Sequence, residues 1–198
     1  GSWRLPDLQL VAAPFVGAIG LYLEGAARSA RLQGLSEFDA WWCWALQAKA
    51  VYFFDGLDPE LFGEGAPRCP GYPPGLATVQ ATAFHAMGST DVITFHLQAC
   101  VVLAALVAAV AGLLADRVRP VLLYPLLLFA IVLPSVTDRL TDGRADLPLG
   151  VFVVVGTVLL VRWLETPGTW LLPGAALLLG AGTLAKREGV LLAACALG

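Results

Sequence analysis

The segment Leu147-Pro-Leu-Gly-Val-Phe-Val-Val-Val-Gly-Thr-Val-Leu-Leu-Val161 contains no charged residue and is bounded by Asp146 and Arg162. A run of this kind is typical of a membrane-spanning helix, which needs about 20 mainly apolar residues. Similar blocks occur elsewhere: about Leu8–Leu23, Val92–Ala115, Val121–Leu133, Trp170–Leu184, and Val190 to the last residue, Gly198. Together they predict an all-α polytopic membrane protein with about five to six transmembrane helices.

The composition supports this class. Of the 198 residues, 58% are hydrophobic and 14% are charged, and the mean hydropathy is +0.76. Soluble domains carry about 25% charged residues. The net charge of −3 and the lack of a basic run argue against a nucleic-acid partner. Because the sixth apolar block stops after nine residues, we expect residues 1–198 to be the N-terminal part of a longer protein.

The positive-inside rule predicts the orientation. The segment Asp116-Arg-Val-Arg119 follows the second block and Arg162 follows the fourth, so both are expected on the cytoplasmic side. A first outer loop, about residues 24–90, and a second, about residues 134–146, are then expected on the opposite face. Arg28 and Arg31 lie on the outer side of this arrangement and disagree with the rule, although the rule applies best to short loops.

The first outer loop contains the segment Gly34-Leu-Ser-Glu-Phe-Asp-Ala-Trp-Trp-Cys-Trp-Ala-Leu-Gln-Ala-Lys49. Ser36 and Asp39 resemble a capping box that opens a helix reaching Phe54. The tryptophans are typical of an interfacial helix that lies on the membrane. Asp39 is therefore either a helix-capping carboxylate or a functional one. Cys43 and Cys69 can form a disulfide if the loop faces an oxidising compartment, which the spacing alone does not decide.

Charged residues also lie at two other positions on the expected outer face. Asp146 opens the fourth block, where capping alone explains a carboxylate. Asp138, Arg139, Asp142 and Arg144 are interpreted as solvated charges or mutual pairs. Lys186-Arg187-Glu188 joins the fifth and sixth blocks with almost no loop. Basic side chains suit a phosphate and carboxylates suit activation of a hydroxyl, but Lys186 and Glu188 can equally pair with each other.

The order of these motifs resembles the N-terminal half of membrane glycosyltransferases of the GT-C superfamily. The nearest kin are glycosyltransferase family 39-like proteins, relatives of protein O-mannosyltransferases and aminoarabinose transferases. The resemblance rests on these matching segments: Phe38-Asp39-Ala40-Trp41 with Trp44, Ala48-Lys49-Ala50, Tyr72-Pro73, Ala145-Asp146-Leu147-Pro148-Leu149 and Lys186-Arg187-Glu188-Gly189. One departure is the turn Cys69-Pro70-Gly71-Tyr72-Pro73, where such proteins often have a His-Pro-Asp-Tyr-Pro-like sequence.

The resemblance implies transfer of a sugar, with inversion, from a polyprenyl-phosphate donor to an acceptor hydroxyl on a glycan, lipid or protein. The expected location is a bacterial plasma membrane, with the site facing outward. Asp39 would act as catalytic base, and Asp146 would orient the acceptor or assist. Substrate-binding residues would be Glu37, Trp41, Lys49, Tyr72, Lys186, Arg187 and Glu188.

The resemblance leaves a divalent metal open and implies no soluble organic cofactor. No Cys/His spacing resembles a zinc site. Two other functions remain open: a secondary transporter and a non-catalytic membrane scaffold. Almost no charge lies within the spans, which argues against the transporter.

Overall fold

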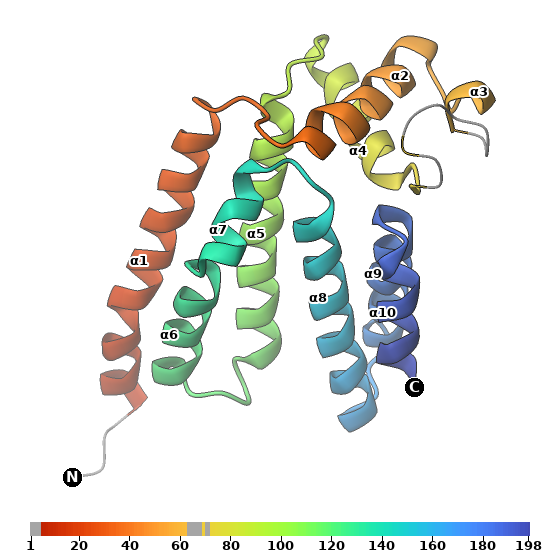
Figure 1. The fold of residues 1–198 in the computed structure, drawn as a ribbon. Coiled ribbons are helices and arrows are strands. Elements are labelled where there is room, and N and C mark those ends of the chain that lie inside the picture. Colours follow the sequence, from red (N-terminus) through yellow and green to blue (C-terminus); the bar gives the residue numbers. More distant parts are fainter. Residues whose placement is uncertain (1–4, 63–68, 70–71) are drawn as a thin grey trace.

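The computed structural model describes residues 5–62, 69 and 72–198, which form an all-helical fold with no strand among them (Figure 1). The helices are α1 (Leu5–Ala30), the π-helix η1 (Ala40–Ala45), α2 (Leu46–Phe54), α3 (Pro59–Phe62), α4 (Gly75–Met87), α5 (Ile93–Leu114), α6 (Pro120–Ile131), α7 (Pro134–Thr141), α8 (Asp146–Glu165), α9 (Leu171–Ala185) and α10 (Glu188–Leu197). The long helices run side by side, and η1, α2 and α4 lie across one end of them.

Three helices of the described chain are long and apolar enough to cross a membrane: α1 over Leu10–Ala30, α5 and α8. A fourth span results if α6 and α7, which meet at an angle of 55°, form one bent unit. The expected count of five to six spans is not confirmed, because α9 has 15 residues and α10 has 10. A helix rises 1.5 Å per residue, so each is shorter than the roughly 30 Å of hydrocarbon in a bilayer.

Helix α1 continues beyond the first apolar block and past residue 24, near which the first outer loop was expected to begin. The helix ends at Ala30. Residues 24–30 are rich in alanine, and Arg28 pairs with Glu24 one turn earlier. Helix propensity and this i, i+4 pair both favour continuation of the helix after the apolar run has ended.

The predicted helix over residues 36–54 is divided into η1 and α2. The capping box is not formed: Asp39 has helical dihedral angles at the N-cap position of η1, and it makes no capping hydrogen bond. The chain winds instead with π-helical spacing through the tryptophan-rich segment before it becomes α-helical at Leu46. π-helical turns are rare and occur frequently at functional sites.

Two hydrophobic clusters hold the described helices together. One lies between the long helices and includes Leu103, Ile131 and Val155. The other lies under η1, α2 and α4 and includes Trp44 and Phe84. The structure pairs Cys43 with Cys69, and both cysteines pack in or against this second cluster. Helices η1, α2 and α4 therefore form a packed layer with its own core.

The connection between α5 and α6 contacts the end of α8. Arg162 donates two hydrogen bonds, each of 2.9 Å, to the two carboxylate oxygens of Asp116. This contact lowers the pKa of Asp116 below its ordinary value, chiefly through the hydrogen bond from Arg162. The two basic segments that were expected on the cytoplasmic side thus lie together at one end of the bundle.

Close packing at the α9–α10 corner predicts a large difference between two glycine substitutions. A Cβ atom added at Gly189 would lie 2.1 Å from the carbonyl oxygen of Gly182. We expect Gly189→Ala to lower the free energy of unfolding by about 1–3 kcal/mol, because the backbone of α9 must move. Gly180→Ala is the control, since no atom lies within 4 Å of its added Cβ. Equal stability of the two variants in thermal unfolding in detergent would contradict the packing.

Candidate functional site

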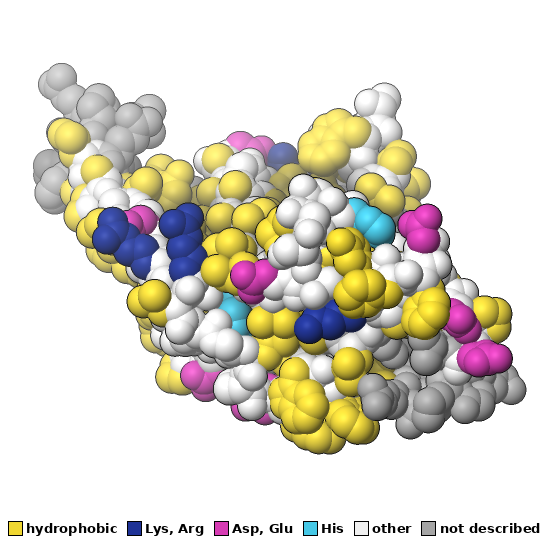
Figure 2. Space-filling view, turned by 90° about the horizontal axis from the view of Figure 1, so that it is seen from above, with side chains coloured by type: hydrophobic (Ala, Val, Ile, Leu, Met, Phe, Trp, Pro, Cys, Tyr) yellow, Lys and Arg dark blue, Asp and Glu magenta, His cyan; other side chains and the backbone are white. Residues whose placement is uncertain are grey.

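Six charged residues from three parts of the chain meet at the end of the bundle that η1 and α4 cover. We call Arg139, Asp142, Arg144, Asp146, Lys186 and Glu188 the ionic cluster. Hydrophobic side chains cover much of this end of the molecule, and Lys and Arg side chains lie among them (Figure 2). The mutual pairing expected for Arg139, Asp142 and Arg144 is present, whereas Asp138 is exposed.

Asp142 is the most buried member of the ionic cluster, with a side chain 5% exposed. Its Oδ2 accepts hydrogen bonds from Arg139 at 2.9 Å and from Nε of Arg144 at 3.0 Å. Its Oδ1 accepts the backbone N–H of Arg144 at 2.9 Å. Gly143 makes the turn possible because its φ of +68° lies in the left-handed region. The sequence predicted Asp142 as a solvated or paired charge but not its burial, since burial of a loop carboxylate is a tertiary property.

Asp146 connects two distant parts of the chain. Lys186 Nζ lies 2.6 Å from Asp146 Oδ1, and Arg139 Nη1 lies 3.1 Å from Asp146 Oδ2. Lys186 also lies 3.6 Å from Glu188, so the alternative of a local Lys–Glu pair is present as well, at a longer distance. The predicted candidates Asp146, Lys186 and Glu188 are thus brought together.

The surroundings of Lys186 stabilise its positive charge. Burial lowers the pKa of this ammonium group, but the hydrogen bond and charge of Asp146, with smaller effects of Glu188 and Tyr72, outweigh burial and raise the pKa above its ordinary value. The resulting stabilisation is complete below the unfolded pKa of about 10.4 and is lost only as pH rises through the higher folded value. Lys186 therefore remains cationic at neutral pH.

Tyr72 is positioned beside the ionic cluster by the second hydrophobic cluster. Its ring packs edge-to-face on Trp44, with the ring centroids 5.1 Å apart. The start of α4 approaches the end of α9 so closely that a Cβ added at Gly75 would lie 2.5 Å from the carbonyl oxygen of Leu184. Tyr72 thus lies between the disulfide at Cys69 and the corner that carries Lys186.

Asp39 is exposed, and its side chain makes no hydrogen bond or ion pair with any residue that the structure describes. The segment around it nevertheless packs on the second outer loop. A Cβ added at Gly143 would lie 3.2 Å from Cβ of Ala40 and 2.6 Å from a methyl group of Leu35. Asp39 therefore lies in the segment from Leu35 to Ala40, which packs against the loop that contains Gly143 and Arg144. Trp41, a further predicted residue, is also exposed and contacts the rings of Phe38 and Trp42.

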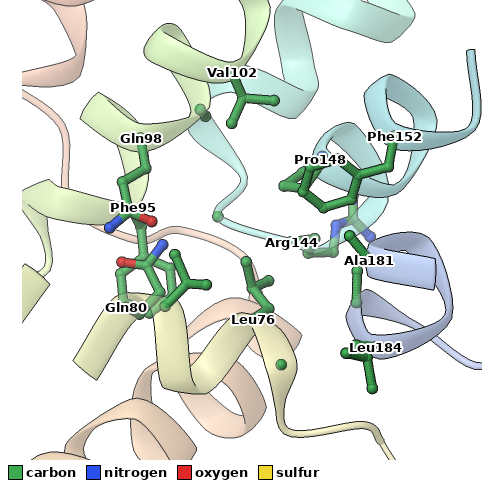
Figure 3. A pocket seen from close by; sticks show the side chains of 15 residues that line it. Leu76, Gln80, Phe95, Gln98, Val102, Arg144, Pro148, Phe152, Ala181 and Leu184 are labelled. Carbon is green, nitrogen blue, oxygen red and sulfur yellow. The ribbon is translucent and has the colours of Figure 1, made fainter. Parts of the chain in front are cut away.

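Arg144 lies between two cavities of opposite character. The apolar cavity, of about 190 Å³, is enclosed by α4, α5, α8 and α9. In Figure 3, Gln80 and Gln98 lie on one side of it, and Pro148, Phe152 and Ala181 lie on the other. The polar cavity, of about 340 Å³, is lined by Glu37, Asp138 and Arg139, with several hydroxyl side chains. Arg144 lines both cavities.

The two remaining basic candidates, Lys49 and Arg187, lie in different parts of the fold. Lys49 lines a separate pocket with Trp42 and Phe53, and it forms no ion pair with the ionic cluster. Arg187 is exposed at the position before α10, next to Lys186. The structure therefore separates Lys49 from the other basic candidates, although the motif had suggested one common site.

The contacts of Asp146 do not suit a divalent metal. Its two oxygens face the cationic groups of Lys186 and Arg139, which would repel a second cation. Among residues 5–62, 69 and 72–198, no three His, Cys, Asp or Glu side chains form a group that could hold a metal ion.

Comparison of the chain with protein families, with curated proteins and with solved structures found no match.

The burial of Asp142 predicts a strong dependence of stability on its charge. We expect Asp142→Asn to lower the free energy of unfolding by about 2–4 kcal/mol, because two arginines would lose their common counter-ion. Asp138→Asn serves as the control, since that exposed carboxylate lies in the same segment and forms no ion pair with the described chain. Similar unfolding curves for both variants would contradict a structural role of Asp142.

Proposed function

We propose that this chain carries the site of a GT-C-type membrane glycosyltransferase, which moves a sugar from a polyprenyl-phosphate donor to an acceptor hydroxyl. The observation that carries the proposal is the position of Arg144 and Lys186. Arg144 separates an apolar cavity from a polar one, and Lys186 directly follows the apolar lining residue Ala185. A lipid-linked sugar has the same order of chemistry: hydrocarbon, phosphate, then hydroxyl groups.

The donor would bind across the two cavities, with its phosphate at Arg144 and Lys186. Its hydrocarbon chain would occupy the apolar cavity beside Pro148 and Phe152, where burial excludes water from the chain. Its phosphate would contact the guanidinium of Arg144 and the ammonium of Lys186, which both form strong charge-assisted hydrogen bonds. Its sugar would face the polar cavity, where Glu37 and Asp138 can accept hydrogen bonds from hydroxyl groups.

The two proposed catalytic carboxylates would have different tasks. Asp146 is already engaged by Lys186 and Arg139, so it would position the phosphate-binding lysine. Asp39 makes no such contact among the described residues and would take the proton of the acceptor hydroxyl. The acceptor oxygen then bonds to the anomeric carbon from the face opposite the phosphate, and the carbon–phosphate oxygen bond breaks. The polyprenyl phosphate leaves with the bonding electrons, and the configuration inverts.

The proposed location is a bacterial plasma membrane, with the ionic cluster facing outward. The disulfide between Cys43 and Cys69 supports an oxidising side for the first outer loop. Arg117, Arg119 and Arg162 lie at or near the opposite end of the bundle, as the positive-inside rule requires for a cytoplasmic face. We further propose that α9 and α10 are the remaining members of the expected five to six spans.

Replacement of the proposed base should abolish turnover while donor binding is retained. We expect Asp39→Asn to lower the rate of sugar transfer from a labelled polyprenyl-phosphate sugar in membranes by about 100-fold or more, because a general base contributes a factor of this size. Glu60→Gln is the control, since it removes an exposed carboxylate from the same outer loop. Equal rates for Asp39→Asn and the parent would exclude Asp39 as base. No transfer from any donor would favour the scaffold or the transporter.

Removal of the proposed phosphate ligand should act mainly on donor affinity. We expect Lys186→Gln to raise the KM for the lipid donor by about tenfold, the effect of one lost charge-assisted hydrogen bond. Lys186→Arg should restore most of the affinity, because it keeps the charge beside Asp146. The concentration dependence of transfer at neutral pH measures this change. An unchanged KM in a folded Lys186→Gln protein would remove Lys186 from the donor site.

A further inference from the structure

A third pocket lies on the helices η1, α2 and α3, and none of its residues belongs to the ionic cluster. It has a volume of about 350 Å³ and lies between η1, α2 and α3. The rings of Trp42, Phe53 and Phe62 form much of its wall, and Gln47 and Lys49 are its polar side chains. We call it the aromatic pocket.

Gln47 is buried without a hydrogen-bond partner for its carbonyl oxygen. The residue is 7% exposed, and its Oε1 atom contacts no donor among the described residues. Buried polar side-chain atoms of native proteins nearly always have a partner. A half-turn about the last torsion of the side chain presents either the oxygen or the NH₂ group, so the amide can accept or donate one hydrogen bond. Because Gln47 also lines the pocket, a hydroxyl or another polar group that enters the pocket is a partner that this amide can take.

Lys49 adds a positive charge to the same pocket without a matching carboxylate. Its side chain is half-buried beside Leu46 and Phe53, and it forms no ion pair within the described chain. A partly buried ammonium group beside aromatic rings and hydrocarbon loses some of its hydration, which strengthens its attraction for an anion. The pocket thus combines one cationic donor, one amide and an apolar wall.

The position of the pocket indicates where its ligand comes from. Near the pocket, the surface exposes large hydrophobic side chains: Trp41, Phe53, Phe54 and Leu57 are 45–69% exposed. Such a surface is unfavourable in water, and aromatic side chains of this kind favour the level of the lipid headgroups. The side chain of Phe53 belongs both to this exposed surface and to the pocket wall. The bilayer surface is therefore the source that the observations favour.

We propose that the aromatic pocket binds the headgroup of an anionic, hydroxyl-bearing phospholipid, with the chemistry of phosphatidylglycerol. Lys49 contacts the phosphate, and the Gln47 amide bonds to a hydroxyl of the headgroup. The rings of Trp42 and Phe53 pack against the glycerol and the first acyl carbons. This site is independent of the proposed glycosyl transfer, and it assigns Lys49 to the attachment of the outer loop to the membrane.

The experiment measures lipid binding by native mass spectrometry of the purified protein in detergent. Phosphatidylglycerol and phosphatidylcholine of identical acyl chains are titrated separately. We expect the parent to bind phosphatidylglycerol at least tenfold more tightly than phosphatidylcholine. Lys49→Gln should remove most of this preference, because the phosphate loses its charged partner. Lys49→Arg should keep it, and Gln47→Leu should weaken binding of phosphatidylglycerol by severalfold.

Arg31→Gln is the matched control, because it removes one exposed positive charge from the same end of the protein but far along the chain from the pocket. A loss of preference in Arg31→Gln as large as in Lys49→Gln would overturn the proposal in favour of general electrostatic attraction. Retention of the preference in Lys49→Gln would also overturn it. Equal competition by free glycerol 3-phosphate would show that the pocket takes a soluble anion and would exclude the lipid.

Discussion

The contact between Lys186 and Asp146 organises the end of the bundle where the two outer loops meet. It joins residues 40 positions apart at 2.6 Å and places the α9–α10 corner against the start of α8. Arg139 extends the contact to Asp142, and Asp142 in turn holds Arg144. Charges near a bilayer are costly unless they are paired, so this chain of ion pairs makes it possible for six charged side chains to lie beside apolar helices.

Packing of the first outer loop complements the ionic cluster. The disulfide between Cys43 and Cys69, the contact of Trp44 with Tyr72 and the close approach of Gly75 to Leu184 all join this loop to the bundle. Because the loop has its own hydrophobic cluster, it can place polar groups at defined positions above the apolar cavity. The proposed separation of tasks uses this arrangement: Arg144 and Lys186 would bind the phosphate of the lipid donor, whereas Gln47 and Lys49, in a separate pocket, would bind a phospholipid headgroup.

Much of the helical architecture could be predicted from local patterns. The apolar runs anticipated α5, α8 and α9, and the order of charged segments anticipated which connections share an end of the bundle. The residues at which the helices begin and end were less predictable. Helix α1 extends through Glu24 and Arg28 because alanine-rich sequence remains helical without an apolar face, and the tryptophan segment is π-helical instead of following Ser36 as a capped α-helix. The burial of Ala40 and Trp44 against other helices outweighs the local capping preference of Ser36. A local sequence pattern contains no information about such packing.

By itself, the sequence determined that the chain is helical and has segments apolar enough to cross a membrane, because uncharged blocks of about 15 or more residues can satisfy their own backbone groups as helices. It also indicated that Asp146 and Lys186 lie at the ends of apolar blocks, where charges beside a membrane are usually paired. Only the tertiary structure decided that these two residues form a pair, that Asp142 is buried between two arginines, and that Lys49 lies in a separate pocket. The physical reason is that ion pairs and cavities depend on distances between elements far apart in the chain, and the spacing of residues along a sequence does not contain those distances.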